Sequence, residues 1–331
     1  MPSADHVKAL ISALLEGDEA HFYAVAMQTA AYEARMGHGK LAEEIRSLID
    51  KAKARPRFPA KNAIPMVRPK GEASELLSVS YPNVALKDVI LAPATRRKLD
   101  RVVREQRAVQ MIRGRGLSPR RKILLSGKPG TGKTLTAHAL AGELGLPLFV
   151  VRLDGLITKF MGETAAKLRI VFEALSQTRG VYLFDEFDSI GSARDLSNDV
   201  GEIRRVVNSF LQMVEQDQSE SLIVAATNHP DILDRALFRR FDDIIKYDMP
   251  DRERILATFK AKLGQFKTSK LIYTQLAKLA SGLSFADITR ACEEAIKDSI
   301  IHGQEHVSHA QIAQALKDRR LAVAEGHKEA R

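Results

Sequence analysis

One stretch of eight residues constrains this chain more than any other. Residues 127–134 read GKPGTGKT and fit the pattern G-x-x-x-x-G-K-[ST], in which backbone N–H groups surround the phosphates of a nucleotide. The apolar residues 123–125 before the stretch predict a buried strand, and the apolar spacing after it predicts a helix. A strand, a loop and a helix in this order are the context that a phosphate-binding loop requires. The sequence therefore predicts a nucleotide-binding protein.

The residue types in the loop have separate chemical roles. Glycines let the backbone bend tightly around phosphate, and the N-terminus of the following helix supplies partial positive charge. Lys133 is expected to reach the β- and γ-phosphates of the nucleotide, while the Thr134 hydroxyl is expected to bind Mg²⁺. The predicted nucleotide contacts from this loop are Pro129, Gly130, Thr131, Gly132, Lys133, Thr134 and Leu135.

Composition indicates an ordinary soluble globular protein. The chain has 331 residues, of which 45% are hydrophobic and 28% are charged. No apolar run approaches the roughly 18 residues that a membrane span needs, and residues 1–20 lack the pattern of a secretory signal. The one cysteine, Cys292, excludes an internal disulfide and fits a reducing environment. We therefore expect a cytoplasmic location and no membrane partner.

The net charge of +10 is unevenly distributed along the chain. Residues 51–70 contain seven Lys or Arg and no acid, and residues 96–122 contain eleven Lys or Arg against two acids. Such segments can bind nucleic acid or another acidic partner. They can also be a solvated linker followed by a solvated helix face, and this second interpretation is favoured.

The first 83 residues divide into a helical part and a linker. Residues 1–54 are predicted to be a small helical module, and Leu41, Ile45, Leu48 and Ile49 form an apolar stripe at helical spacing. About fifty residues bury little surface alone, so the module is either a docking domain completed by a partner or a cap on the main domain. Residues 55–83 are predicted to be a basic linker, because the four prolines in its first part favour extended chain.

Strands and helices are predicted to alternate over residues 84–250. Near-continuous apolar strands between helices indicate a parallel sheet covered on both faces. The rest of the chain, 251–331, is predicted to be a smaller all-helical lid, with a frayed tail after about Ala322. The predicted strands beyond the first are 148–153, 181–184 and 222–226, and the predicted helices are 94–110, 165–175, 202–214, 251–263, 271–280, 285–302 and 308–318.

Polar residues follow two of the predicted strands at the point where each strand ends. Asp185 and Glu186 follow residues 181–184, and Asn228 follows the strand that begins at residue 222. Ligands of parallel sheets bind at the carboxyl ends of the strands. We therefore expect Asp185 to hold Mg²⁺, Glu186 to polarise the water that attacks the γ-phosphate, and Asn228 to orient that water.

Two adjacent arginines, Arg239 and Arg240, follow this region. Adjacent arginines are commonly surface charges. An arginine placed on the developing charge also accelerates phosphoryl transfer, and it often comes from a neighbouring subunit. This second interpretation predicts a ring in which each active site is completed by the next subunit.

Taken together, residues 84–300 resemble an AAA+ ATPase of the branch that contains katanin, spastin, the ESCRT-disassembly ATPase and the membrane-bound AAA proteases. The resemblance rests on five motifs in the family's order: 127–134 (Walker A), 181–186 (Walker B), Asn228 (sensor 1), 239–242 (the arginine-finger segment) and 282–288, which reads GLSFADI against the family's G-x-S-G-A-D-I. It implies an α/β P-loop NTPase fold with a helical lid, and ATP with Mg²⁺ as its ligands.

Two departures from the family pattern concern the region around the adenine. Phe285 stands where the family has a glycine, and residues 88–91 read DVIL where the family has D-[IV]-x-G. By the resemblance, Val89, Ile90 and Ala286 are candidates for contact with the nucleotide, and the adenine pocket is expected to be bulkier than usual.

The resemblance also implies a function for residues 159–163, which read KFMGE. The family has an aromatic pore loop at this place, so Lys159, Phe160 and Met161 are expected to face the channel of a homo-hexamer. An aromatic ring there can grip an extended polypeptide of any sequence. From the residues alone, Phe160 would be assigned to the core.

Three functions are compatible with these observations. The first is an ATP-driven protein remodeller whose substrate docks on residues 1–54; since H-E-x-x-H is absent, any proteolysis must come from a separate chain. The second is an ATPase that acts on nucleic acid, which the net charge suggests. The third is a nucleotide-gated scaffold that regulates a partner protein such as a protease or a toxin.

Overall fold

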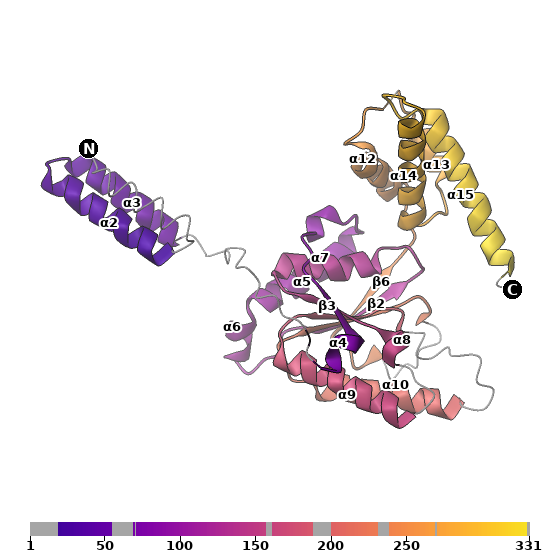
Figure 1. Ribbon diagram of the computed structural model, residues 1–331, viewed down its shortest axis with the longest axis horizontal. Coiled ribbons are helices and arrows are strands. Elements are labelled where there is room, and N and C mark those ends of the chain that lie inside the picture. The colour runs from indigo at the N-terminus through magenta and orange to yellow at the C-terminus, as the bar shows by residue number, and fades with distance from the viewer. Residues whose placement is uncertain are drawn as a thin grey trace. The chain divides into compact units, whose positions relative to one another are not determined.

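The computed structural model describes residues 19–54, 69, 71–156, 161–187, 200–230, 238–268 and 270–329. The chain divides into two compact units, Met1–Ala63 and Ile64–Arg331 (Figure 1). Each unit is considered separately below.

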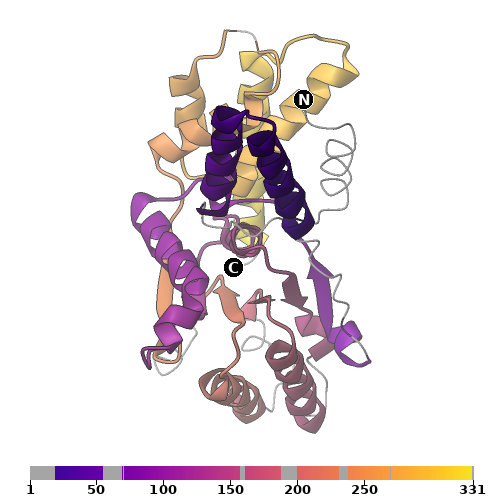
Figure 2. The ribbon, with the colours of Figure 1, turned by 90° about the vertical axis from the view of Figure 1, so that its left-hand side faces the viewer.

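The N-terminal unit contains a helical hairpin. Helices α2 (Glu19–Arg35) and α3 (Gly39–Ala54) pack side by side through small and β-branched residues that include Val25, Ala30 and Ile49 (Figure 2). The turn between them is joined by the pair Glu33–His38, at 2.7 Å. The predicted helical structure is confirmed for residues 19–54, but the apolar stripe is divided, since Ile49 is buried while Leu41 and Leu48 are exposed. Residues 1–18, the first part of the predicted helical module, lie outside the described residues.

The second unit is built around a six-stranded sheet with the strand order β1-β3-β4-β5-β2-β6 (Figure 1). All neighbouring strands are parallel except β1, which pairs antiparallel with β3, so the predicted parallel sheet is in fact mixed. The strands are β1 (Leu77–Ser80), β2 (Lys122–Gly127), β3 (Leu148–Val151), β4 (Val181–Phe184), β5 (Leu222–Thr227) and β6 (Asp243–Tyr247).

The antiparallel strand lies in the segment that was predicted to be linker. The short helix α4 (Ala73–Leu76) and strand β1 bury Leu76 and Leu77, and the Arg152 backbone N–H donates to the Leu76 carbonyl. These contacts place residues 73–80 in the folded unit, so the boundary of the linker at residue 83 was wrong. Strand β3 also ends two residues earlier than predicted, because Leu153 begins helix α8 (Leu153–Leu156).

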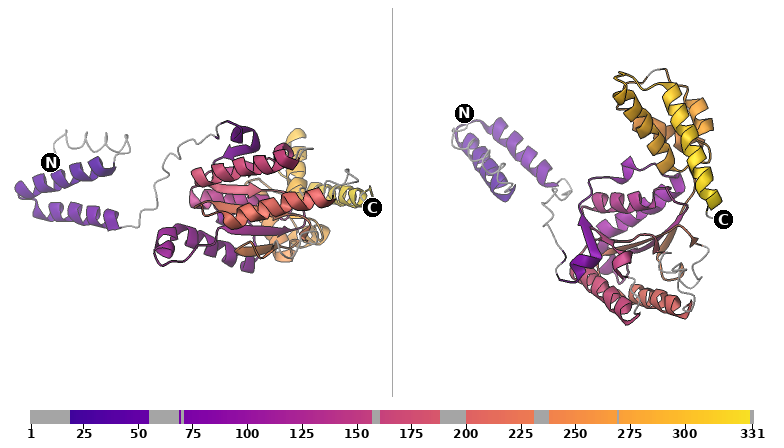
Figure 3. Two further views of the ribbon diagram at one scale, coloured as in Figure 1. Left: turned by 90° about the horizontal axis from the view of Figure 1, so that it is seen from below. Right: turned by 45° about the vertical axis from the view of Figure 1, so that its right-hand side comes forward.

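Alternate side chains of the strands build two cores on opposite faces of the sheet. In β2, Leu124 joins one core while Ile123 and Leu125 join the other. Helices α9 (Met161–Gln177) and α10 (Val200–Gln216) cover the first face, and α5 (Pro93–Arg107) and α7 (Lys133–Leu144) cover the second (Figures 1 and 3). The predicted helix 94–110 is interrupted at Ala108, after which α6 (Val109–Arg113) follows. The predicted three-layer α/β fold is therefore confirmed.

In the described part of the lid, four helices surround a hydrophobic core that is separate from the two cores of the sheet. They are α12 (Arg252–Leu263), α13 (Tyr273–Leu279), α14 (Phe285–Ile301) and α15 (His309–Glu329). The expectation of a frayed tail after Ala322 is wrong, because α15 continues to Glu329. Val323 packs on the lid core, and Arg319, earlier in the same helix, pairs with Asp287 at 2.8 Å. Cys292 lies in this core, where burial raises the pKa of its thiol to about 12.

The described helices include none with the length and apolar character of a membrane span.

Candidate nucleotide-binding site

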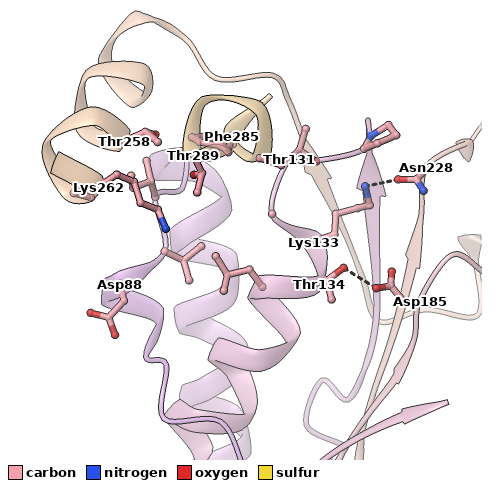
Figure 4. A pocket seen from close by; sticks show the side chains of 18 of the residues that line it. Asp88, Thr131, Lys133, Thr134, Asp185, Asn228, Thr258, Lys262, Phe285 and Thr289 are labelled. Atoms are coloured by element: carbon pink, nitrogen blue, oxygen red, sulfur yellow. Dashed lines mark hydrogen bonds between the residues drawn. The ribbon is translucent and has the colours of Figure 1, made fainter. Parts of the chain in front are cut away.

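A cavity of about 460 Å³ lies where the carboxyl edge of the sheet meets the lid (Figure 4). Its walls come from the phosphate-binding loop, the ends of β4 and β5, the segment at η1 (Leu86–Asp88), and helices α12 and α14. The lining residues are Asp88, Val89, Ile90, Pro129, Gly130, Thr131, Gly132, Lys133, Thr134, Leu135, Asp185, Glu186, Asn228, Thr258, Ala261, Lys262, Phe285, Ala286 and Thr289.

The loop between β2 and α7 is the base of this cavity. Gly132 adopts the left-handed conformation, with φ 99°, at the N-cap of α7, and Lys133 is the first residue of the helix. The Thr131 hydroxyl donates to the Lys128 carbonyl at 2.7 Å, which closes the turn of the loop. The first backbone N–H groups of a helix have no partners within the helix, so the start of α7 presents donors and partial positive charge to an anion in the cavity.

Lys133 and Asn228 meet at the carboxyl edge of the sheet, as their positions after β2 and β5 predicted. The Lys133 ammonium donates to the Asn228 side-chain oxygen at 2.8 Å, and to the carbonyls of Gly127 and Lys128 at 2.7 and 3.0 Å (Figure 4). Lys133 is only 6% exposed. These contacts hold the ammonium group beside the loop that surrounds the phosphates.

Thr134 and Asp185 form a second pair of predicted site residues that the structure brings together. The Thr134 hydroxyl donates to an oxygen of the Asp185 carboxylate at 2.6 Å (Figure 4). Hydroxyl and carboxylate oxygens are ligands that Mg²⁺ prefers, in company with phosphate oxygens. The two side chains therefore fit a Mg²⁺ ion bound together with a nucleotide.

Glu186 follows Asp185 at the edge of the cavity. Its side chain is exposed, and its backbone φ of 49° is the left-handed value that non-glycine residues rarely adopt. The Glu186 backbone N–H donates to Asp185 at 3.0 Å. The adjacent Phe187 is fully buried and contacts the Phe210 ring, with 4.5 Å between centroids. Because Phe187 must turn inward directly after the strand, Glu186 is turned toward the cavity.

The other end of the cavity is formed partly by residues that the sequence did not indicate. Val89, Ile90 and Ala286 line it as expected. Asp88, the first residue of the DVIL segment, lines it as well. Four lid residues also line it, although no motif pointed to them, because their place depends on how the lid packs beside the sheet. These lid residues are Thr258, Ala261 and Lys262 from α12 and Thr289 from α14.

The lid contacts the phosphate-binding loop directly. The Ala286 backbone N–H donates to the Gly130 carbonyl at 3.2 Å. Ser284 caps α14 in a reciprocal pair with Asp287, which also accepts from Arg319 on α15. Burial alone would raise the pKa of Asp287, but the hydrogen bonds from Ser284 and Arg319 outweigh it and lower that pKa. The start of α14 is thus fixed on one side to the loop and on the other to the last helix.

Gly130 leaves no room for a side chain at this contact, so Gly130→Ala is expected to weaken ADP binding at least about tenfold. An added Cβ would lie 2.3 Å from the Ser284 hydroxyl oxygen, which would force the lid away from the loop. Gly132→Ala is the control: both glycines have positive φ and share a backbone cost of roughly 1–2 kcal/mol, but nothing lies within 4 Å of a Cβ at 132. Calorimetric titration measures both, and equal losses would contradict a lid clash.

The predicted arginines do not line the cavity of their own chain. Arg239 is exposed, and Arg240 pairs with Glu215 at the end of α10, at 3.0 Å. Completion of a neighbour's site by these arginines stays a prediction. Lys159 and Phe160 lie outside the described residues, and Met161 is the first residue of α9, which begins four residues earlier than predicted.

Comparison with known proteins agrees with this geometry. The model of the family described as "ATPase family associated with various cellular activities (AAA)" matches residues 123–249, from within strand β2 to two residues after strand β6. A Sinorhizobium fredii protein named uncharacterized AAA family ATPase y4kL is 36% identical over 304 residues, which cover 91% of each chain.

Two further relatives are longer than this chain. The ATP-dependent zinc metalloprotease FtsH 1 of Symbiobacterium thermophilum is 34% identical over 74% of this chain, and the proteasome-activating nucleotidase of Methanococcus vannielii is 37% identical over 61% of it. The matched part spans about half or less of these relatives, 42% and 51% of their lengths. The similarity therefore concerns only part of each of these two proteins. With the loop, the Thr134–Asp185 pair and the match over 91% of y4kL, this chain belongs to the AAA family of ATPases, which bind ATP with Mg²⁺ and hydrolyse it.

Proposed function

We propose that this ATPase is a protein remodeller of the branch that contains katanin, spastin, the ESCRT-disassembly ATPase and the membrane-bound AAA proteases. In this proposal it works as a hexameric ring that moves a polypeptide through its central channel. The observation that carries the proposal is the nucleotide cavity shared by the sheet and the lid. A nucleotide in that cavity contacts both parts, so its hydrolysis can change how they sit against each other.

The chemical step is assigned to residues around the phosphate-binding loop. Lys133 neutralises negative charge on the phosphates, and Asn228, which it contacts, orients the attacking water. Glu186 accepts the proton of that water. Thr134 and Asp185 hold Mg²⁺, which when bound withdraws charge from the phosphate oxygens.

The lid then transmits the change at the loop to the rest of the ring. Gly130 bonds to Ala286 at the start of α14, and Asp287 one residue later bonds to Arg319 on α15. A displacement of the loop is therefore passed to two lid helices. In the proposed ring, Phe160 moves with its subunit and pulls on the polypeptide, while residues 1–54 dock the substrate. The proposal includes a cytoplasmic location, for which the support is the single cysteine.

Action on nucleic acid is less well supported. At least seven of the eleven basic residues between 96 and 122 form ion pairs, several with carboxylates distant in sequence: Asp217, Glu220, Glu143 and Asp243. Most of these cations are thus already paired with carboxylates of the same chain. Binding to a nonspecific DNA duplex that falls steeply between low and moderate salt would favour this alternative over the remodeller.

Phe160→Ala separates the remodeller from a nucleotide-gated scaffold. We expect the variant to keep basal ATP hydrolysis within about twofold, because the residue is not assigned to the nucleotide site, and to lose the stimulation of hydrolysis by an unstructured polypeptide such as casein. Lys133→Ala should lose both activities. If Phe160→Ala were stimulated as strongly as the unaltered protein, the threading proposal would be wrong and the scaffold would be preferred.

A further inference from the structure

The nucleotide cavity has two chemically different ends. Lys133, Thr134 and Asp185 lie together at one end, where the phosphates and Mg²⁺ bind (Figure 4). The other end is walled by η1 and its following residues on one side and by lid helices α12 and α14 on the other. Since the phosphates are held at the first end, the ribose and the base must occupy the second.

The lid presents an aromatic ring to this second end. Phe285 is the first residue of α14, is half-buried and lines the cavity, together with Thr289 one turn further along the helix (Figure 4). Its position is fixed from both sides, because Ser284 before it caps the helix and Ala286 after it bonds to Gly130. The family pattern has glycine at this position, so the ring is a feature of this chain.

The lid also presents a cation. Lys262, in the last turn of α12, lines the cavity, and its side chain extends toward it on the side away from Lys133 and Thr134 (Figure 4). With the phosphates bound at the loop, the Lys262 ammonium group lies at the other end of the cavity. It can donate a hydrogen bond to an acceptor on the base or to a ribose hydroxyl.

We propose that Phe285 and Lys262 form a lid subsite for the nucleoside part of the nucleotide. The ring stacks on the purine base, and the ammonium group donates a hydrogen bond to the base or the ribose. Stacking of a base on an aromatic side chain is a substantial and sequence-tolerant source of affinity. Because both residues belong to the lid, a bound nucleoside holds the lid against the loop. A polyphosphate without a nucleoside does not.

The test compares ATP, ADP and inorganic tripolyphosphate, which keeps the phosphates and lacks the nucleoside. Phe285→Gly introduces the residue of the family pattern and is expected to weaken ATP and ADP about tenfold, while tripolyphosphate changes less than about twofold. Phe285→Tyr should retain the affinity, since it keeps an aromatic face. Lys262→Met should weaken ATP and ADP about threefold to tenfold and leave tripolyphosphate unchanged. The competition of each compound with a fluorescent ADP analogue gives the dissociation constants.

Controls keep the result independent of folding and of the remodelling proposal. Phe285→Leu keeps apolar bulk without an aromatic face and should resemble Phe285→Gly, which separates stacking from lid packing. Ile301→Ala, at the exposed far end of the same helix, should bind all three compounds normally. Equal losses for ATP and tripolyphosphate would show that Phe285 only positions the lid, and unchanged ATP affinity would show that it does not contact the base; either result overturns the proposal. Binding is measured without any protein substrate.

Discussion

Glu186→Gln is expected to reduce ATP hydrolysis by about 10²- to 10⁴-fold and to leave ATP binding nearly unchanged. This range is the usual contribution of a general base. The carboxylate is exposed at the edge of the cavity, next to the Asp185 that fits Mg²⁺. An amide has nearly the same shape but cannot accept the proton of the attacking water. Lys133→Ala, in contrast, should lose binding as well as hydrolysis.

The backbone conformation at residue 186 bears on whether this substitution changes the stability of the protein. Residue 186 has φ 49° because the chain must turn between Phe184 and Phe187, both fully buried on the same core. Strained conformations of this kind cost about 1–3 kcal/mol and cluster at functional sites. Glutamine carries the same strain as glutamate, so stability should not change. Single-turnover hydrolysis and a thermal unfolding scan measure both quantities.

The matched control for this prediction is Glu253→Gln. Glu253 is an exposed glutamate in the first turn of α12, and it does not line the cavity. Its replacement should leave hydrolysis within about twofold, as is usual for surface substitutions. A Glu186→Gln variant that hydrolysed ATP as fast as Glu253→Gln would remove Glu186 from the proposed mechanism.

The phosphate end of the site could be predicted from the sequence because its chemistry is local. Residues 127–134 are contiguous, and Asp185 and Asn228 each follow a run of apolar residues that ends at the same edge of the sheet. Parallel pairing alone brings such strand ends together. The nucleoside end could be predicted only in part: Val89, Ile90 and Ala286 line it as expected, whereas Thr258 and Lys262 reach the cavity only through the packing of the lid, for which they carry no motif.

The ion pairs of the basic run 96–122 could not be predicted from the sequence either. Most basic residues of α5 are exposed, as the favoured interpretation expected, but several cations of the run 96–122 pair with carboxylates distant in sequence: Arg107 with Glu143, Arg113 with Glu220, and Lys98 with Asp243. Local charge counts do not detect such pairs. Edge strand β1 was missed for a similar reason, since four residues after a proline-rich stretch become a strand only when they pair with β3.

Arg239→Ala is expected to lower ATP hydrolysis by about 10³-fold with little loss of nucleotide affinity, if the ring is as proposed. Arg239 is exposed and does not line the cavity of its own chain. Phe241, which follows this pair of arginines, is buried in the sheet core, and Arg240 pairs with Glu215. Arg239 is thus an exposed cation on a firmly anchored segment, as a residue that acts on a neighbouring subunit needs to be. Arg97→Ala, at an exposed position on α5, is the control and should hydrolyse ATP normally.

Mixing two inactive variants tests whether the site is shared between subunits. Arg239→Ala retains the phosphate-binding loop and Lys133→Ala retains the arginine, so a site that joins the loop of the first to the arginine of the second is complete. If the two mix randomly in a ring with head-to-tail interfaces, about one quarter of the sites are complete and hydrolysis should recover accordingly. Analytical ultracentrifugation establishes that mixed rings form. Mixed rings without any recovery would show that Arg239 does not act across the interface, whereas full activity of Arg239→Ala alone would remove it from the reaction.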